Sequence, residues 1–156
     1  MPQLSEAVVK KLEAAWSPMR ETVSRLGLER LDTTTSNGWS VKEMLAHVAF
    51  WDEAVLGVVM GMFRHEPLPE DWTFGSGYLP EAGEAWAPTE VHNAREAAWA
   101  RTRSGADVIA RLDCAHGQLV ALLATITDQE MLEHGDYFHR LPLHYAEHHP
   151  ELTEIV

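Results

Sequence analysis

Helical periodicity without any strand-like alternation is the feature that most constrains the fold of this 156-residue chain. Between residues 5 and 26, apolar side chains recur at the three-to-four-residue spacing that gives an α-helix one apolar face. Further faces of this kind run from about residue 40 to 62, from 89 to 126 with a bend expected at Gly105, and from about 141 to 155. No stretch alternates apolar and polar residues as a half-buried strand does. The sequence therefore predicts an all-α protein, a four-helix bundle.

Capping boxes and prolines predict where the helices begin and bend. Residues 40–43 and 127–130 both place a hydroxyl residue three positions before a glutamate, so that each side chain can satisfy a backbone N–H of the first helical turn. The second box is expected to open a short helical turn that ends before Gly135. Pro18 and Pro150 lack the N–H that an internal helix position requires, so a bend is predicted near each.

A long connection separates the second and third helices. Residues 64–88 are rich in proline, glycine and acidic residues and have no helical period. A loop of this length inside a domain is usually functional or packed as a cover. Its aromatic side chains indicate that it packs down onto the helices: Trp72, Phe74, Tyr78 and Trp86.

The composition narrows the function and predicts a soluble, cytoplasmic protein. Lys and Arg total 12 against 24 Asp and Glu, a net charge of -12, so no basic face for nucleic acid is expected. The single cysteine, Cys114, allows no internal disulfide and fits a reducing compartment. The N-terminus does not resemble a signal peptide, and the longest apolar run, residues 54–63, falls short of the roughly 20 residues of a membrane helix. The length predicts a single domain, residues 1–156.

The histidines of HYAEHHPEL, residues 144–152, raise the question of a metal site. His144 and His148 are four residues apart, so on a helix their side chains lie about 40° apart on one face, one turn above the other. Two imidazoles hold a transition metal only weakly, so a third ligand must come from another helix. His47 is the candidate, because it lies at the edge of the apolar face of the second helix. His149 lies about 100° round the helix and is expected at or near the surface.

Other interpretations of these histidines remain as alternatives to a metal site. His144, Glu147 and His148 also form the H-x-x-E-H pattern of a class of zinc peptidases, in which the glutamate is the general base. That chemistry needs a carboxylate ligand well downstream, and only eight residues follow His148, so the peptidase is set aside. Glu147 fits better as a group that orients an imidazole or as a solvated side chain. The five other histidines are interpreted as structural or solvated: His65, His92, His116, His134 and His139.

Three segments give the chain a resemblance to a known family. They are NGWSVKEMLAHVAFWDEAV, HNAREAAWARTRS at the start of the third helix, and the closing HYAEHHPEL. With the long connection, they resemble the DinB-like superfamily of bacterial four-helix-bundle proteins, also called the YfiT type, over essentially the whole chain. The most specific element is the W-S-x(6)-H segment that ends at His47, combined with the terminal H-Y-x-E-H.

The resemblance implies a fold, a metal and a chemistry. It implies an up-down-down-up bundle in which a histidine of the second helix and an H-x-x-x-H pair of the last helix hold a divalent metal, often zinc or nickel. Carried onto this sequence, the ligands are His47, His144 and His148, the three that the spacing selects. Three imidazoles leave a coordination position open for water or substrate, as in catalytic zinc sites. Characterised relatives include transferases and isomerases that use low-molecular-weight thiols, and one branch hydrolyses a reactive small molecule.

Two functions follow as alternatives. One is a metal-dependent enzyme that acts on a small electrophilic molecule, by thiol-dependent S-transfer or isomerisation or by hydrolysis. The other is a non-enzymatic protein that sequesters a metal or small ligand in the same pocket. Candidates for polar groups that orient a ligand or face the substrate are Asp52, Asn93 and Glu147, and each also fits a capping or surface role. A homodimer is compatible with the wide apolar faces and is common among relatives.

Overall fold

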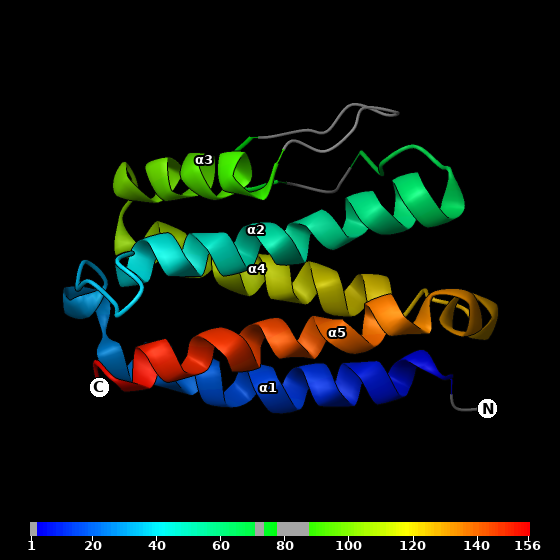
Figure 1. Cartoon of the computed structure of the whole chain (residues 1–156), viewed down its shortest axis with the longest axis horizontal. Helices are drawn as coiled ribbons and strands as arrows, with labels where there is room; N and C mark the ends of the chain where they lie inside the picture. Colours follow the sequence, from blue (N-terminus) through cyan, green and yellow to red (C-terminus); the bar gives the residue numbers. More distant parts are fainter. Residues whose placement is uncertain (1–2, 71–73, 78–87) are drawn as a thin grey trace. The chain divides into compact units, whose positions relative to one another are not determined.

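The apolar periods of the sequence form helices in the computed structural model, which describes residues 3–70, 74–77 and 88–156 (Figure 1). Every named element in these ranges is helical, and they contain no strand beyond one isolated bridge between Thr34 and Ser40. The all-α prediction is therefore confirmed. In chain order the elements are α1 (Ser5–Leu26), η1 (Leu28–Arg30), α2 (Val41–Gly57), η2 (Val58–Arg64), α3 (Thr89–Arg101), α4 (Gly105–Leu123) and α5 (Asp128–Thr153).

Contacts along the chain divide it into two units. The first consists of Met1–Val41 and Val120–Val156, and the second of Lys42–Leu119. The single domain and the up-down-down-up order of the helices stay predictions.

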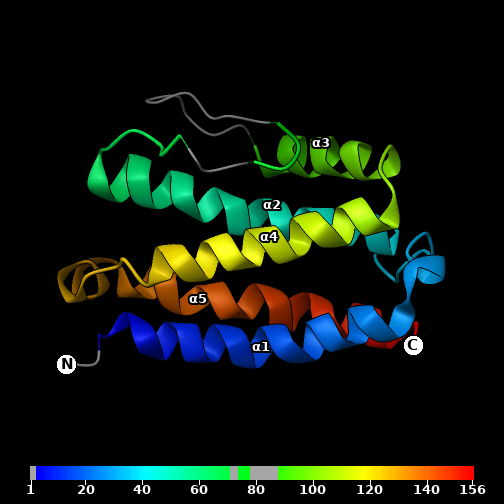
Figure 2. The same ribbon diagram turned by 180° about the vertical axis from the view of Figure 1, so that it is seen from behind.

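In the first unit, α1 and α5 lie side by side (Figures 1 and 2). The rings of Trp16 and Tyr145 pack with their centroids 5.2 Å apart. Closer to the C-terminal end of α1, the Thr22 hydroxyl lies 2.9 Å from Nε2 of His149. The α1 face predicted from the sequence is buried, and α1 continues without a break through Pro18. The core of this unit is thus the seam between the first and last helices.

In the second unit, α2 supplies most of the core. It begins at Val41, directly after Ser40, the first residue of the capping box predicted at residues 40–43. After Gly57 the chain continues as the π-helical stretch η2 to Arg64. Phe50 and Ala54 of α2 form an apolar cluster with Phe74 from the long connection. The expectation that the connection packs down therefore holds for Phe74, which is 5% exposed. The other aromatic residues named for this role lie outside the described residues: Trp72, Tyr78 and Trp86.

The prediction of one continuous helix over residues 89–126 is wrong, because the structure has two helices there. α3 ends at Arg101 and α4 begins at Gly105, where the sequence analysis expected only a bend. The Ser104 hydroxyl accepts a hydrogen bond from the backbone N–H of Asp107 at 3.1 Å. A serine that caps the first turn in this way favours a new helix start over continuation of the preceding helix.

α5 contains both the predicted short helical turn and the predicted last helix, which meet at a kink. It opens with the second capping box, in which the Glu130 N–H donates to Thr127 Oγ1 and the Thr127 N–H donates to Glu130 Oε1, both at 3.1 Å. Within α5, non-helical backbone angles occur at His134 (φ −128°, ψ 20°), so the break expected before Gly135 is present. The helical backbone resumes directly after it rather than near residue 141. The helix then runs through Pro150 to Thr153.

One helical stretch has the length and composition of a membrane span. It is Val41–Arg64, with a mean hydropathy of 1.4 in its most apolar window. The short apolar run 54–63 therefore does not by itself exclude a span, because α2 and η2 join this run to apolar turns before it. However, 78% of the window is buried inside the protein, as in the core helix of a soluble protein. This stretch is weak evidence for a membrane helix, and the cytoplasmic location stays a prediction.

Candidate metal centre

Two histidines of α5 form a close pair. His144 and His148 lie four residues apart on the helix, and their Nε2 atoms are 3.1 Å apart. The ring centroids are separated by 4.7 Å, with the ring planes at 84°. Since the rings meet through nitrogen rather than face to face, one nitrogen of the contact carries a proton and the other offers a lone pair. The pair thus has the one-face geometry that its spacing predicts.

A third histidine is held in a fixed orientation on α2. His47 is 9% exposed, and its Nδ1 lies 2.9 Å from the side-chain oxygen of Asn93 on α3. The indole N–H of Trp51 donates to the same oxygen at 3.2 Å. An indole nitrogen can only donate, so the shared Asn93 atom is an acceptor and His47 Nδ1 must carry the proton. In the neutral imidazole this leaves the Nε2 lone pair of His47 available for a metal.

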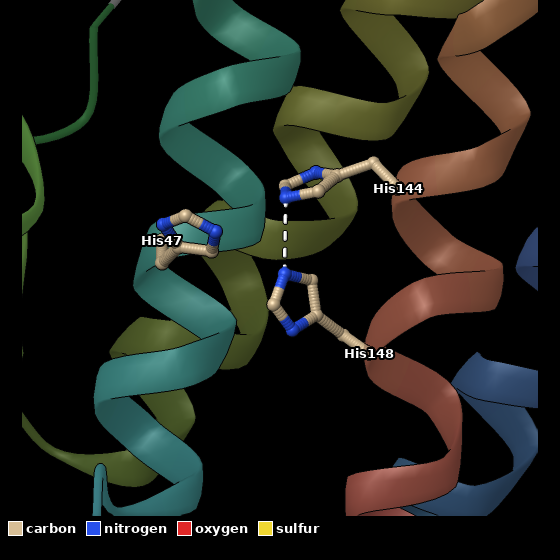
Figure 3. A group of neighbouring side chains, drawn as sticks. All are labelled: His47, His144 and His148. Atoms are coloured by element: carbon tan, nitrogen blue, oxygen red, sulfur yellow. Dashed lines mark hydrogen bonds between the residues drawn. The ribbon is translucent and has the colours of Figure 1, made fainter. Parts of the chain in front are cut away.

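His47, His144 and His148 together form a group that could hold a metal ion. One ligand nitrogen from each residue lies within 4.8 Å of the others. Figure 3 shows the three side chains. Tetrahedral zinc with nitrogen ligands at about 2.0–2.1 Å keeps those nitrogens roughly 3.3 Å apart, close to the spacing in the α5 pair. Three imidazoles suit zinc, nickel, copper or iron. The residues present therefore fit a divalent transition metal.

A carboxylate contacts the Nδ1 side of the His148 ring, and an amide donates to that carboxylate. Glu151 Oε2 is 3.3 Å from His148 Nδ1, and the Asn37 side-chain N–H₂ donates to the same oxygen at 2.9 Å. His148 is nearly buried and Glu151 is partly exposed. From the sequence, Glu147 was the carboxylate expected to orient an imidazole, whereas in the structure Glu151 contacts His148. Asn37 was not identified from the sequence, because it lies 114 positions from Glu151.

The other candidate residues differ in placement. Asn93 contacts His47 directly, as described above. Asp52 is buried on α2, with 5% of its surface exposed. Glu147 is exposed on α5. His149 is half-buried and contacts Thr22, so it joins α5 to α1 rather than the histidine group.

Among the remaining histidines, His92 and His116 are buried and the others are at least partly exposed. His92 is 1% exposed and stacks on Phe50 with the ring centroids 5.0 Å apart. The Arg95 guanidinium lies 3.0 Å from its Nδ1. These contacts give His92 the structural role that the sequence analysis assigned to it, although it is buried rather than solvated.

Sequence reasoning missed a group of buried charges in the second unit. Arg111 on α4 donates from Nε and Nη2 to the two carboxylate oxygens of Glu53 on α2, at 3.0 and 2.6 Å. Its Nη2 also lies 3.0 Å from Glu96 Oε1 on α3. The connection joins this group, since the Gly75 N–H donates to Glu53 and the Ser76 hydroxyl donates to Glu96. The signal available in the sequence was Glu53, an acidic residue inside the most apolar helix. An acidic side chain is almost never buried unless it is paired.

Burial and pairing act in opposite directions on these charges. Burial raises the pKa of Glu53 above its ordinary value, while the hydrogen bonds and charge of Arg111 lower it in part. For Arg111, burial lowers the pKa, but the hydrogen bonds and negative charge of Glu53 and Glu96 raise it by more. Arg111 therefore stays charged, and the group is a fixed internal crosslink between α2, α3, α4 and the connection.

Comparison with known families gives a match over most of the chain. The sequence model of the DinB superfamily matches residues 11–150. The chain belongs to the DinB superfamily. The match includes all three histidines of the group, and Glu151 lies one position beyond it. Comparison of this DinB protein with curated proteins and with solved structures gave no match.

Proposed function

We propose that this DinB protein is a metal-dependent enzyme that acts on a small electrophilic molecule, with His47, His144 and His148 as the metal ligands. The reaction would be thiol-dependent S-transfer or isomerisation, or hydrolysis. The observation that carries the proposal is the histidine group, in which one nitrogen of each side chain lies within 4.8 Å of the others. Membership of the DinB superfamily supports it, because metal binding is typical of that superfamily.

The environment of each imidazole supports a role as a ligand. His47 and His148 both have a hydrogen-bond acceptor at Nδ1, the amide oxygen of Asn93 and the carboxylate of Glu151. Metal-bound histidines usually donate their second N–H in this way, which fixes the ring and its tautomer. Both residues therefore present Nε2 as the metal-binding atom.

The chemistry expected of such a site needs an open coordination position on the metal and an apolar surface that contacts the substrate. A divalent metal held by three imidazoles would supply a Lewis acid that polarises a substrate or lowers the pKa of a nucleophile. Trp51 lies beside His47, with the ring centroids 6.4 Å apart, and is half-buried. Its indole offers an apolar surface for a small organic molecule, while its N–H keeps Asn93 in place.

Metal content tests the ligand assignment. Freshly purified protein is expected to contain about one zinc or nickel ion per chain by elemental analysis, as a single three-histidine site requires. His47→Ala, His144→Ala and His148→Ala should each weaken zinc binding by more than the roughly 100-fold that loss of an outer partner costs. His139→Ala is the matched control, because His139 is an exposed histidine of the same helix α5. Equal zinc affinity in all four variants would refute the site.

Turnover assays distinguish the enzyme hypothesis from the hypothesis of a non-enzymatic sequestration protein. The metal-loaded protein would be assayed with glutathione, bacillithiol or mycothiol and a chlorodinitrobenzene, and separately for hydrolysis of an epoxide. Activity that is lost in His47→Ala together with the metal supports the enzyme. Stoichiometric metal without turnover on any pair would favour the non-enzymatic alternative. A homodimer, tested by light scattering, stays part of the proposal.

A further inference from the structure

The turn before α2 holds one amide in a defined orientation. The Asn37 side-chain oxygen accepts hydrogen bonds from the Trp39 backbone N–H at 2.9 Å and from the Thr35 hydroxyl at 2.7 Å. A backbone N–H can only donate, so this atom is the oxygen and the NH₂ group must point the other way. Gly38 at φ 92° lets the backbone close the turn, with its N–H donating to the Thr35 carbonyl at 3.0 Å.

The NH₂ group of Asn37 points to the last helix. It donates to Glu151 Oε2 at 2.9 Å, and the same oxygen lies 3.3 Å from His148 Nδ1. An ionised carboxylate only accepts hydrogen bonds, so the proton of the contact belongs to His148 Nδ1. The lone pair of His148 is then on Nε2, the atom that faces His144 at 3.1 Å. A series of bonds thus runs from the turn at Asn37 through Glu151 to the metal-facing nitrogen of His148.

We propose that Asn37 and Glu151 are positioning residues that fix the ring and the tautomer of His148, so that its Nε2 is prepared to bind a metal before the metal arrives. Glu151 is therefore neither a metal ligand nor a general base. The effect on metal affinity rests on the proposed function, whereas the tautomer of His148 does not. Loss of such a partner typically weakens metal binding by about 10- to 100-fold.

The tautomer is measured first, on metal-free protein. In protein labelled with ¹⁵N-histidine, long-range ¹H–¹⁵N spectra identify which ring nitrogen of His148 carries the proton. Wild type is expected to show the Nδ1–H form. Glu151→Ala should give a mixture with the Nε2–H form, and Glu151→Gln should keep most of the Nδ1–H form because its amide oxygen can accept the same bond. An unchanged Nδ1–H signal in Glu151→Ala would overturn the proposal.

Zinc affinity is measured second, by competition with a chromogenic chelator. Glu151→Ala should bind zinc about 10- to 100-fold more weakly than wild type, and Asn37→Ala should lose less because the carboxylate remains. Glu154→Ala is the control, since Glu154 is exposed at the C-terminal end of the same helix, three residues after Glu151. Equal affinity of Glu151→Ala and Glu154→Ala would also overturn the proposal. If wild type itself bound no zinc, the proposed function would fail, and the tautomer measurement would still decide this inference.

Discussion

Arg111 holds Glu53 by two parallel hydrogen bonds, at 3.0 and 2.6 Å, with both side chains almost fully buried. Replacing Arg111 by Met would keep the volume of the side chain but leave Glu53 and Glu96 buried without their shared cation. Breaking a buried pair in this way typically costs about 3–5 kcal/mol of unfolding free energy. Chemical denaturation of wild type and Arg111→Met would measure the loss.

The control for Arg111→Met is a surface ion pair. Arg25 and Glu21 lie one turn apart on α1 with side chains 61% and 64% exposed. Arg25→Met is expected to change the unfolding free energy by no more than about 0.5 kcal/mol. Similar losses in the two variants would contradict the buried crosslink.

The cost of Arg111→Met should depend on pH. Burial raises the pKa of Glu53 in the folded state, and Arg111 opposes that rise. A raised folded pKa means that the stability linked to Glu53 is fully present below its unfolded pKa of about 4.5 and is lost as pH rises through the folded value. Without Arg111 the folded pKa rises further, so the variant should lose more stability at pH 8 than near pH 5. A loss that is constant over this range, measured by denaturation at several pH values, would argue against the mechanism.

Gly75 is expected to tolerate no side chain. A Cβ there would overlap the Arg111 side chain, which cannot move aside because Glu53 and Glu96 hold it. Gly75→Ala should therefore destabilise the protein by about 1–3 kcal/mol, the usual cost of overpacking. Gly117→Ala serves as the control, because Gly117 lies exposed in α4 with open space around it. That control should be neutral or stabilise by up to about 1 kcal/mol. Thermal or denaturant unfolding of both variants provides the measurement.

Asn93→Leu should loosen His47. It replaces the acceptor of the His47 Nδ1–H by an apolar group of similar size, and zinc affinity should fall by about 10- to 100-fold. Trp51→Phe removes only the second donor to the Asn93 oxygen, so it should have a smaller effect. Chelator competition measures both. If Trp51→Phe weakened zinc binding more than Asn93→Leu, the amide would not be the group that orients His47.

Local sequence signals predicted the helices but not all of their ends. The capping box at Thr127 correctly starts α5, and the period of residues 5–26 correctly gives α1. The division between α3 and α4 was missed, because Ser104 caps a new helix where the apolar spacing still permits continuation. The break predicted before Gly135 is present as the kink at His134, whereas the start of the last helix near residue 141 was wrong, because the helical backbone resumes directly after the kink.

What the sequence by itself determined is the helical class and the His144–His148 pair, because both depend on residues within one or two helical turns of each other. Tertiary structure alone decided which polar groups stand behind the histidines and which charges pair in the interior. Glu151 meets Asn37 across 114 positions, and Arg111 meets Glu53 across 58. At such separations no periodicity links the partners; they are brought together by burial of the apolar helix faces, which then requires each enclosed polar group to have a partner.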